Sequence, residues 1–280
     1  SQALKPKALS LVVAGGVIAA VVGPTLTEWL RDVGGYPLFS LCYAAFVGLA
    51  LLSLLIALCL PNDAGMASAV NSAAKPASVR AEPAGPSVVV AMAVAALGYG
   101  IMNLLMIQAS MHMKHMHEDF TDVRLAIQWH VIAMFAPSFF TGAIIQRLGI
   151  KTTICAGLAL LIGCSAMNIW SHSYAMMTLA LIALGLGWNL TYVGGGALLA
   201  QSLQNSPAAM QMQGKNDLAI AIFATLGAFS PSLLLSSVGW DGTNAICMVL
   251  CLGLLVATAS LLQNNCLLYT SPSPRDKRQS

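Results

Sequence analysis

The feature that most constrains the fold is a series of apolar stretches, each long enough to cross a lipid bilayer. A membrane-spanning helix needs about 20 mostly apolar residues. Eight stretches meet that requirement: 9–30, 37–60, 87–111, 125–146, 152–170, 174–200, 217–238 and 243–262. Only 8% of the residues are charged, whereas soluble globular proteins carry about 25%. The sequence therefore predicts an all-α, polytopic membrane helix bundle; for the first stretch alone, the core of a signal peptide is an alternative.

The connection between the second and third stretches differs from all the others. Residues 61–86 are rich in Ala, Ser and Pro and show no helical periodicity, which is typical of a flexible linker. We therefore predict two spans in residues 1–60 and a six-helix bundle in residues 87–262. The tail, 263–280, changes composition abruptly; it resembles translated cloning-adapter sequence and is expected to be artefactual or disordered, an ordinary basic tail being the alternative.

The distribution of charges predicts the orientation of these spans, because Lys and Arg concentrate in cytoplasmic loops. With the first span entered from the cytoplasm, seven basic residues face that side: Lys5, Lys7, Lys75, Arg80, Arg147, Lys151 and Lys215. Three face outward: Arg31, Lys114 and Arg124. Acidic residues collect in the outer loops: Asp32, Glu118, Asp119, Asp122 and Asp241. The opposite topology reverses the bias, so we predict cytoplasmic ends for the linker and for Lys215.

Two short motifs connect this architecture with a known family. The segment GAIIQRLGIK, residues 142–151, resembles the cytoplasmic loop signature of the major facilitator superfamily, with Gln146 in place of the usual aspartate. The segment GGVIAAVVGP, residues 15–24, resembles the Gly-Pro motif of the fifth helix in many members. Three further segments resemble a bacterial-type branch that includes riboflavin transporters: IQWHVIAMFAPSFFTG, GLGWNLTYVGGGALL and QGKNDLAIA.

The resemblance covers nearly all of residues 5–262 and implies a specific assignment of helices. Residues 9–60 correspond to helices five and six of a twelve-helix transporter, and residues 87–262 to helices seven to twelve. Eight of the twelve helices are then expected in this chain, the first four being absent. In the loop signature, Gly142, Arg147, Gly149 and Lys151 match the family pattern, and the fifth-helix motif implies a helix-packing role for Gly15, Gly16, Gly23 and Pro24.

Polar residues inside membrane spans are costly and usually face a cavity or a neighbouring helix. Three spans each carry a partly polar, partly aromatic face at one-turn intervals: Tyr99, Asn103, Met106 and Ser110; His130, Met134, Ser138 and Thr141; Gly185, Asn189, Tyr192 and Gly196. Facing one another, these residues would line a passage that binds a solute by stacking and hydrogen bonds. We predict six substrate-binding residues: Tyr99, Asn103, His130, Met134, Asn189 and Tyr192. The alternative is that the amides bond across helix contacts and hold the bundle together.

The residues predicted to act in gating are Gly142, Arg147, Gly149, Lys151 and Asp217. Arg147 and Lys151 are expected either to latch a neighbouring helix end on the cytoplasmic side or only to set topology. Asp217, directly after Asn216, is expected to cap the start of its helix. No Asp or Glu lies deep inside a predicted span, so a proton carrier would be His130, would lie in the absent helices, or would not exist. Pro137 and Pro231 lie mid-span and are expected to kink their helices.

Other classes of site have weaker support in the sequence. Six of the seven cysteines lie in apolar runs, where cysteine behaves as a small hydrophobe, and none has metal or redox spacing. The run MHMKHMH, residues 111–117, combines His with soft Met ligands, but it lies in a solvated outer loop. We therefore predict no metal and no cofactor. The net charge of +3 is too small to indicate nucleic-acid binding.

Three functions remain open at this point. The first is a secondary active or facilitative transporter, monomeric in the plasma or inner membrane, that moves a small organic solute such as riboflavin by alternating access. Hydrophobic drug-like compounds are the alternative solute. The second is a membrane enzyme, which needs converging catalytic groups; only scattered His and Ser are present, so we predict that the chain is not an enzyme. The third is a non-transporting receptor that retains the fold.

Overall fold

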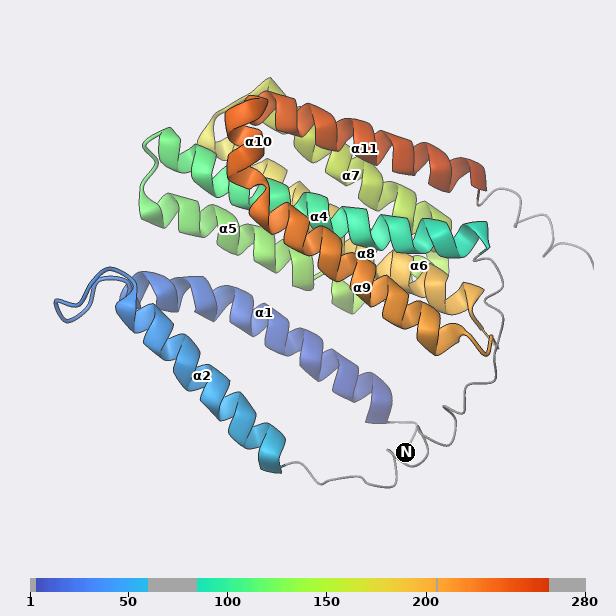
Figure 1. Cartoon of the computed structure of the whole chain (residues 1–280), viewed down its shortest axis with the longest axis horizontal. Coiled ribbons are helices and arrows are strands. Elements are labelled where there is room, and N and C mark those ends of the chain that lie inside the picture. The colour runs from blue at the N-terminus through green and yellow to red at the C-terminus, as the bar shows by residue number, and fades with distance from the viewer. Residues whose placement is uncertain (1–3, 60–84, 205, 262–280) are drawn as a thin grey trace, which may run out of the picture. The chain divides into compact units, whose positions relative to one another are not determined.

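The computed structural model of the chain describes residues 4–59, 85–204 and 206–261, which are helical and contain no β-strand (Figure 1). The described residues fall into two compact units, one within Ser1–Ala20 and Pro83–Ser280, the other within Val21–Glu82. Most of the predicted linker and the predicted tail lie outside the described residues. The division of the chain at residues 61–86 therefore stays a prediction.

Eight helices form the bundle that follows the linker. They are α4 (Pro86–His115), α5 (Phe120–Phe135), α6 (Ser138–Leu148), α7 (Ile150–Trp170), α8 (Tyr174–Ser202), α9 (Ala209–Phe229), α10 (Pro231–Ser237) and α11 (Gly239–Leu261). The bent pairs α5–α6 and α9–α10 each act as one span, and the short connections return the chain directly, so successive spans run antiparallel (Figure 1). This confirms the all-α membrane bundle predicted from the sequence.

Two of the predicted spans are bent pairs of helices rather than single rods. Helices α5 and α6 meet at 47°, and α9 and α10 meet at 52°. Pro137 and Pro231 begin the second member of each pair, and each lacks the N–H that would continue the preceding helix. Five other described helices are long and apolar enough to cross a membrane, and the bent pairs raise the number to seven.

Helix α8 is the centre of the bundle and packs against α4, α5 and α7. Glycines permit these approaches: a Cβ at Gly187 would lie 2.9 Å from the Gly157 carbonyl of α7, and one at Gly195 would lie 3.1 Å from the Ala91 carbonyl of α4. A Cβ at Gly185 would collide with the His130 carbonyl of α5. Small residues let transmembrane backbones approach closely, so the glycines of α8 fix its position among its neighbours.

The bundle contains an internal repeat that the sequence shows in two places. The segment ALGYGIMNL in α4, residues 96–104, matches ALGLGWNL in α8, residues 183–190. The segment FAPS at the α5–α6 bend, residues 135–138, matches FSPS at the α9–α10 bend, residues 229–232. Helices α4, α5–α6 and α7 therefore correspond to α8, α9–α10 and α11, the pattern of membrane folds built from two three-span repeats.

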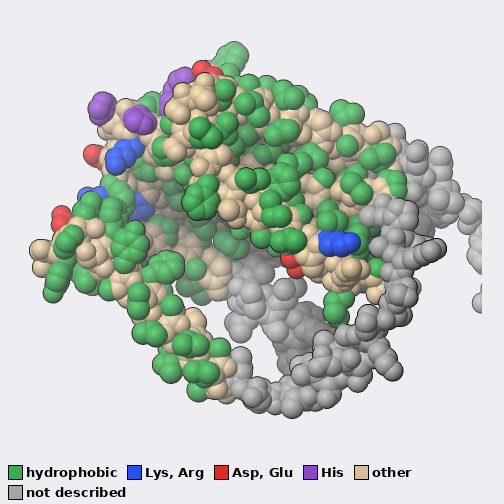
Figure 2. All heavy atoms as spheres, viewed as in Figure 1, with side chains coloured by type: hydrophobic (Ala, Val, Ile, Leu, Met, Phe, Trp, Pro, Cys, Tyr) green, Lys and Arg blue, Asp and Glu red, His purple; other side chains and the backbone are tan. Residues whose placement is uncertain are grey.

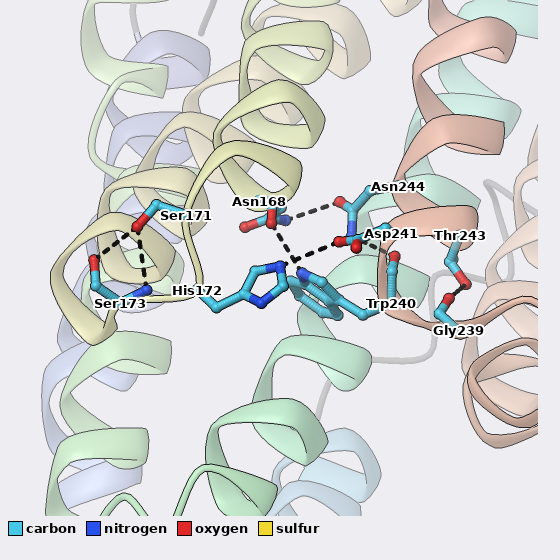
Figure 3. Close-up of polar contacts among 9 residues, drawn as sticks. All are labelled: Asn168, Ser171, His172, Ser173, Gly239, Trp240, Asp241, Thr243 and Asn244. Carbon is cyan, nitrogen blue, oxygen red and sulfur yellow. Dashed lines mark hydrogen bonds and ion pairs between the residues drawn. The ribbon is translucent and has the colours of Figure 1, made fainter.

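Helices α7 and α11 are joined near one end of the bundle by a closed set of hydrogen bonds (Figure 3). The Asn168 amide donates to the Asn244 side-chain oxygen at 2.9 Å, and the Asn244 amide donates to the Trp240 carbonyl at 3.0 Å. The Trp240 indole N–H completes the set by donating to the Asn168 carbonyl at 3.0 Å. Beside them, His172 Nε2 lies 3.2 Å from Asp241 Oδ1. These bonds place the end of α7 against the start of α11.

The smaller unit contains the C-terminal part of α1 (Leu4–Leu30) and α2 (Ser40–Cys59). A turn joins them, in which the Phe39 N–H donates to the Arg31 carbonyl at 2.8 Å. Further along, the Cys42 thiol donates to the Thr27 carbonyl at 3.5 Å. Large apolar side chains are exposed along α2, for example Phe46 and Leu58. Such exposure is expected of a helix whose surroundings are lipid or other apolar helices.

The surface of the bundle supports its placement in a membrane. On the face in view, hydrophobic side chains cover most of the area, and histidine side chains gather at the end where α4 stops and α5 starts (Figure 2). Exposed apolar residues include Leu226, Phe229 and Val249. Because large exposed apolar surfaces are rare on soluble monomers, this surface fits the hydrocarbon of a bilayer.

Candidate functional site

Four aromatic side chains from three helices form one cluster, which we call the aromatic cluster: Tyr99 of α4, Phe135 of α5, and Trp188 and Tyr192 of α8. Trp188 and Tyr192 are stacked, with ring centroids 5.0 Å apart and planes 15° apart. Tyr99 meets Trp188 edge-on at 5.5 Å and Tyr192 at 6.0 Å. Phe135 approaches Trp188 edge-on at 6.2 Å. Trp188 is therefore the ring that all the others contact.

The cluster forms because α4 and α8 approach closely at this level. A Cβ at Gly98 would lie 3.1 Å from the Thr191 hydroxyl oxygen, so a larger residue there would push the helices apart. Tyr99 follows Gly98 directly, and Trp188 and Tyr192 are one turn apart on α8. The sequence spacing predicted Tyr99 and Tyr192 as members of one site, and the structure brings them together.

The cluster extends from the interior of the bundle to its surface. Trp188 is only 6% exposed, whereas Tyr192 is 39% exposed. The Asp217 carboxylate of α9 lies close enough to act electrostatically on the Tyr192 hydroxyl, as does Tyr99. A planar molecule arriving from the surface would therefore meet an aromatic ring with a carboxylate nearby.

Asn189 was predicted to face the solute together with Tyr192. In the structure its side chain lies at the α5–α6 bend instead. Its side chain is 1% exposed. The amide donates to the Met134 carbonyl at 2.7 Å and to the Ser138 hydroxyl at 2.6 Å, and its oxygen accepts from the Thr141 hydroxyl at 2.6 Å. Both donors and the acceptor of this amide thus form bonds between helices. The structure therefore favours the alternative interpretation, in which Asn189 holds the bundle together.

Asn103, His130 and Met134 also lie at helix contacts. The Asn103 amide donates to the Ala224 carbonyl of α9 at 3.1 Å. His130 is fully buried, and its Nδ1 lies 2.8 Å from the Leu181 carbonyl of α8, so this nitrogen carries the proton. Met134 belongs to the apolar core. The six predicted substrate-binding residues therefore divide into two aromatic ones that meet and four that pack helices. Solute contact by all six stays a prediction.

The loop-motif residues surround the junction of α6 and α7. Gly149 has a φ of +84° and ends α6, a conformation that glycine adopts without strain. Lys151 donates to the Ala259 carbonyl in the last turn of α11 at 2.9 Å. That bond satisfies a carbonyl at a helix end; a gating role for Lys151 and Gly149 stays a prediction. Gly142 and Arg147 are exposed on α6, so their gating role stays a prediction.

The prediction for Asp217 as a helix cap is wrong. Helix α9 begins at Ala209, well before Asp217, because the polar segment QMQGKND is helical as well. The Asp217 carboxylate instead accepts from the Gln213 amide one turn earlier at 2.9 Å. Asp217 therefore lies within α9 rather than at its start. The expectation that no carboxylate lies deep inside a membrane span stays a prediction.

The glycines of the fifth-helix motif have varied surroundings within α1. A Cβ at Gly15 or Gly23 would meet no described atom within 4 Å, whereas one at Gly16 would lie 3.1 Å from the Phe135 ring. Pro24 lies inside the helix. Helix packing by Gly15, Gly23 and Pro24 stays a prediction.

Comparison with known proteins assigns the family. The family model of the Major Facilitator Superfamily matches residues 88–280. The chain belongs to the major facilitator superfamily. The riboflavin transporter RfnT of Brucella anthropi is 32% identical over 244 residues, which cover 86% of this chain and 60% of that protein. The chain thus spans about 60% of that relative's length.

Two further relatives belong to the same superfamily. The uncharacterized MFS-type transporter YdeG of Bacillus subtilis is 34% identical over 50% of this chain and 33% of its own length. YddS of the same organism, also an uncharacterized MFS-type transporter, is 30% identical over 79% of this chain and 54% of its own length. No solved structure matches the chain. The superfamily assignment confirms an integral, multi-pass membrane protein.

Sequence reasoning missed two residues that the superfamily bundle places at key positions. Trp188 is central to the aromatic cluster, and Gln108 is buried at the α9–α10 bend, where its amide donates to the Pro231 carbonyl at 2.9 Å. The similarity of ALGYGIMNL and ALGLGWNL relates the two segments, but it places Trp188 opposite Ile101 and Tyr99 opposite Leu186, so it did not identify Trp188 as a member of the cluster. Within the described ranges, no group of three or more His, Cys, Asp or Glu side chains is arranged so that it could bind a metal ion.

Proposed function

We propose that the protein is a membrane transporter that moves a planar, hydrogen-bonding organic solute, riboflavin or a similar metabolite, by alternating access. The observation that carries the proposal is the contact of Tyr99, Trp188 and Tyr192 between two repeat-related helices. Transporters built from repeats bind their solutes near the middle of the membrane, where the repeats meet. Aromatic side chains at such a place suit a flat ring, which they contact over a large area.

The relatives add independent support for this solute class. A riboflavin transporter matches most of this chain, and riboflavin carries a flat three-ring system together with hydroxyl and carbonyl groups. Stacking on Tyr192 and Tyr99 provides contact with the ring system. The Asp217 carboxylate near Tyr192 provides an acceptor for hydroxyl groups of the solute.

The first experiment measures riboflavin uptake by cells that lack their own riboflavin transporter, with the protein expressed from its complete reading frame. Uptake should saturate with concentration and should exceed that of cells with an empty vector. Tyr192→Ala removes the exposed ring and should weaken the apparent affinity roughly tenfold, since aromatic pairs contribute about 0.5–1.5 kcal/mol beyond area burial. Tyr192→Phe retains the ring and serves as the matched control. Uptake equal to the empty vector would refute riboflavin as the solute.

A second experiment addresses coupling to protons, for which Asp217 is the candidate carboxylate. Ionisable groups within membrane spans often form proton pathways, and Asp217 lies inside α9 and acts electrostatically on Tyr192. Asp217→Asn keeps the size and the bond to Gln213 but cannot take up a proton. If Asp217 carries protons, a pH gradient should accelerate uptake by the wild type and not by this variant. Equal acceleration of both proteins would exclude Asp217 from coupling.

A further inference from the structure

Two buried tryptophans in the bundle differ in one respect. Trp240 is 5% exposed, and its indole N–H donates to the Asn168 carbonyl at 3.0 Å (Figure 3). Trp188 is 6% exposed, yet its indole N–H has no hydrogen-bond partner in the described part of the chain. A buried Trp usually finds a partner for this donor, because leaving it without one is unfavourable. Trp188 therefore retains an unused donor inside the protein.

The position of this donor relates it to the solute. Trp188 contacts every other ring of the aromatic cluster, so a molecule that stacks within the cluster lies against the indole. Tyr192 covers one face of the indole and is itself 39% exposed. Rotation of the Tyr192 side chain would uncover this face of the indole without any displacement of a helix.

We propose that the Trp188 indole N–H donates a hydrogen bond to an acceptor atom on the edge of the solute ring. This inference rests on the proposed function and narrows its solute class to planar heteroaromatic rings that carry a ring nitrogen or a carbonyl oxygen. Aromatic hydrocarbons and drug-like cations without such an acceptor leave the donor unused and are bound more weakly.

The neighbouring polar groups cannot provide this recognition as readily. Asn189 is adjacent in sequence, but both of its donors and its oxygen are bound at the α5–α6 bend. The His130 Nδ1 proton is directed at the Leu181 carbonyl. The donor of Trp188 differs from these because binding a solute acceptor breaks no existing bond.

The first test compares Trp188→Phe with Trp240→Phe in the absence of solute. Both substitutions keep an aromatic ring and remove an indole N–H. Trp240→Phe removes a formed hydrogen bond and should lower Tm by roughly 2–4 °C. Trp188→Phe loses the same ring volume but removes a donor that is unused in the free protein, so its Tm should fall clearly less than that of Trp240→Phe. A loss of Tm in Trp188→Phe as large as that in Trp240→Phe would show that the donor has a structural partner and would overturn the proposal.

The second test measures flavin binding by fluorescence quenching, with the purified complete protein in nanodiscs. The probes are riboflavin and four analogues that each weaken one edge acceptor: 1-deaza-, 5-deaza-, 2-thio- and 4-thioriboflavin. The analogue whose altered atom is the acceptor of the indole N–H should bind the wild type about tenfold more weakly than riboflavin does. Trp188→Phe should bind riboflavin about tenfold more weakly and should no longer distinguish that analogue from riboflavin. Trp170→Phe, at an exposed residue, is the control and should bind like the wild type.

The outcomes separate this inference from the proposed function. If Trp188→Phe binds riboflavin and all four analogues with wild-type affinities, the indole donor does not recognise the solute and only this inference fails. If the wild type binds none of the flavins, the proposed solute class fails and this inference fails with it.

Discussion

The two bent spans, α5–α6 and α9–α10, share a sequence pattern but are held by different contacts. Each contains Phe, a small residue, Pro and Ser in succession, at residues 135–138 and 229–232, and the bends are nearly equal, 47° and 52°. Each bend also receives a buried side-chain amide from a central helix, Asn189 of α8 in one case and Gln108 of α4 in the other. The two repeat-related helices thus each hold the bend of the other repeat, although Gln108 and Asn189 do not occupy the same position of the repeated segment.

The difference lies in how completely each amide is used. Asn189 binds Met134, Ser138 and Thr141, all of which belong to the bent span itself. Gln108 donates to the Pro231 carbonyl of α10 and, at 3.3 Å, to the Thr243 hydroxyl of α11, while its side-chain oxygen has no partner among the described residues. The α5–α6 bend is therefore closed by a complete network. The α9–α10 bend is held by an incomplete network, which predicts that the angle of the α9–α10 bend changes more easily than that of the α5–α6 bend.

The largest expected effect is that of Asn189→Ala. It leaves the Met134 carbonyl and two hydroxyl groups without their partner in a site that water does not reach. Such losses cost about 1–3 kcal/mol for a buried polar group, and single interhelical bonds in membranes average roughly 0.6 kcal/mol. We expect a loss of about 2 kcal/mol in the free energy of unfolding, measured by denaturation in mixed detergent micelles. Asn103→Ala, which removes a single bond, is the control and should lose less than half as much.

The two bends could be predicted from the sequence, but the contacts of the Asn189 and Gln108 side-chain amides with these bends could not. Pro137 and Pro231 lack a backbone N–H wherever they stand, so a local rule was sufficient to place both bends. Asn189 was predicted to face the solute because a polar residue in a span has two possible environments, a passage or a helix contact, and periodicity does not separate them. Gln108 has no local pattern at all, since its partners Pro231 and Thr243 are distant in sequence.

Local sequence patterns do not show contacts between distant residues, and this also explains why only part of the aromatic cluster was predicted. Tyr99 and Tyr192 were placed on faces that were expected to meet, because each belongs to a partly polar stripe at one-turn spacing on its own helix, and their rings are neighbours in the structure. Trp188 was overlooked because it is one position before Asn189 and therefore about 100° away from it on the helix. Its importance depends on the close approach of α4 and α8 at Gly98, which is a property of packing.

The second expected effect is that of Gln108→Leu, which has a similar size but no polar atoms. The substitution removes two hydrogen bonds, but it also removes the unpartnered Gln108 oxygen, whose burial is itself unfavourable. We expect a loss of about 0.5–1 kcal/mol, measured in the same unfolding experiment. A loss equal to that of Asn189→Ala would contradict the distinction between the two bends.

The smallest expected effect compares two serines that occupy the same position of the repeated pattern. Ser138 accepts the Asn189 amide at 2.6 Å, whereas Ser232 is exposed on α10. Ser138→Ala removes one acceptor from the network but leaves the other bonds of Asn189, so the free energy of unfolding should fall by about 0.6 kcal/mol. Ser232→Ala should leave it unchanged within error. Because both serines follow a proline in FAPS and FSPS, an equal effect of the two substitutions would mean that the local pattern, and not the amide from α8, determines the strength of the bend.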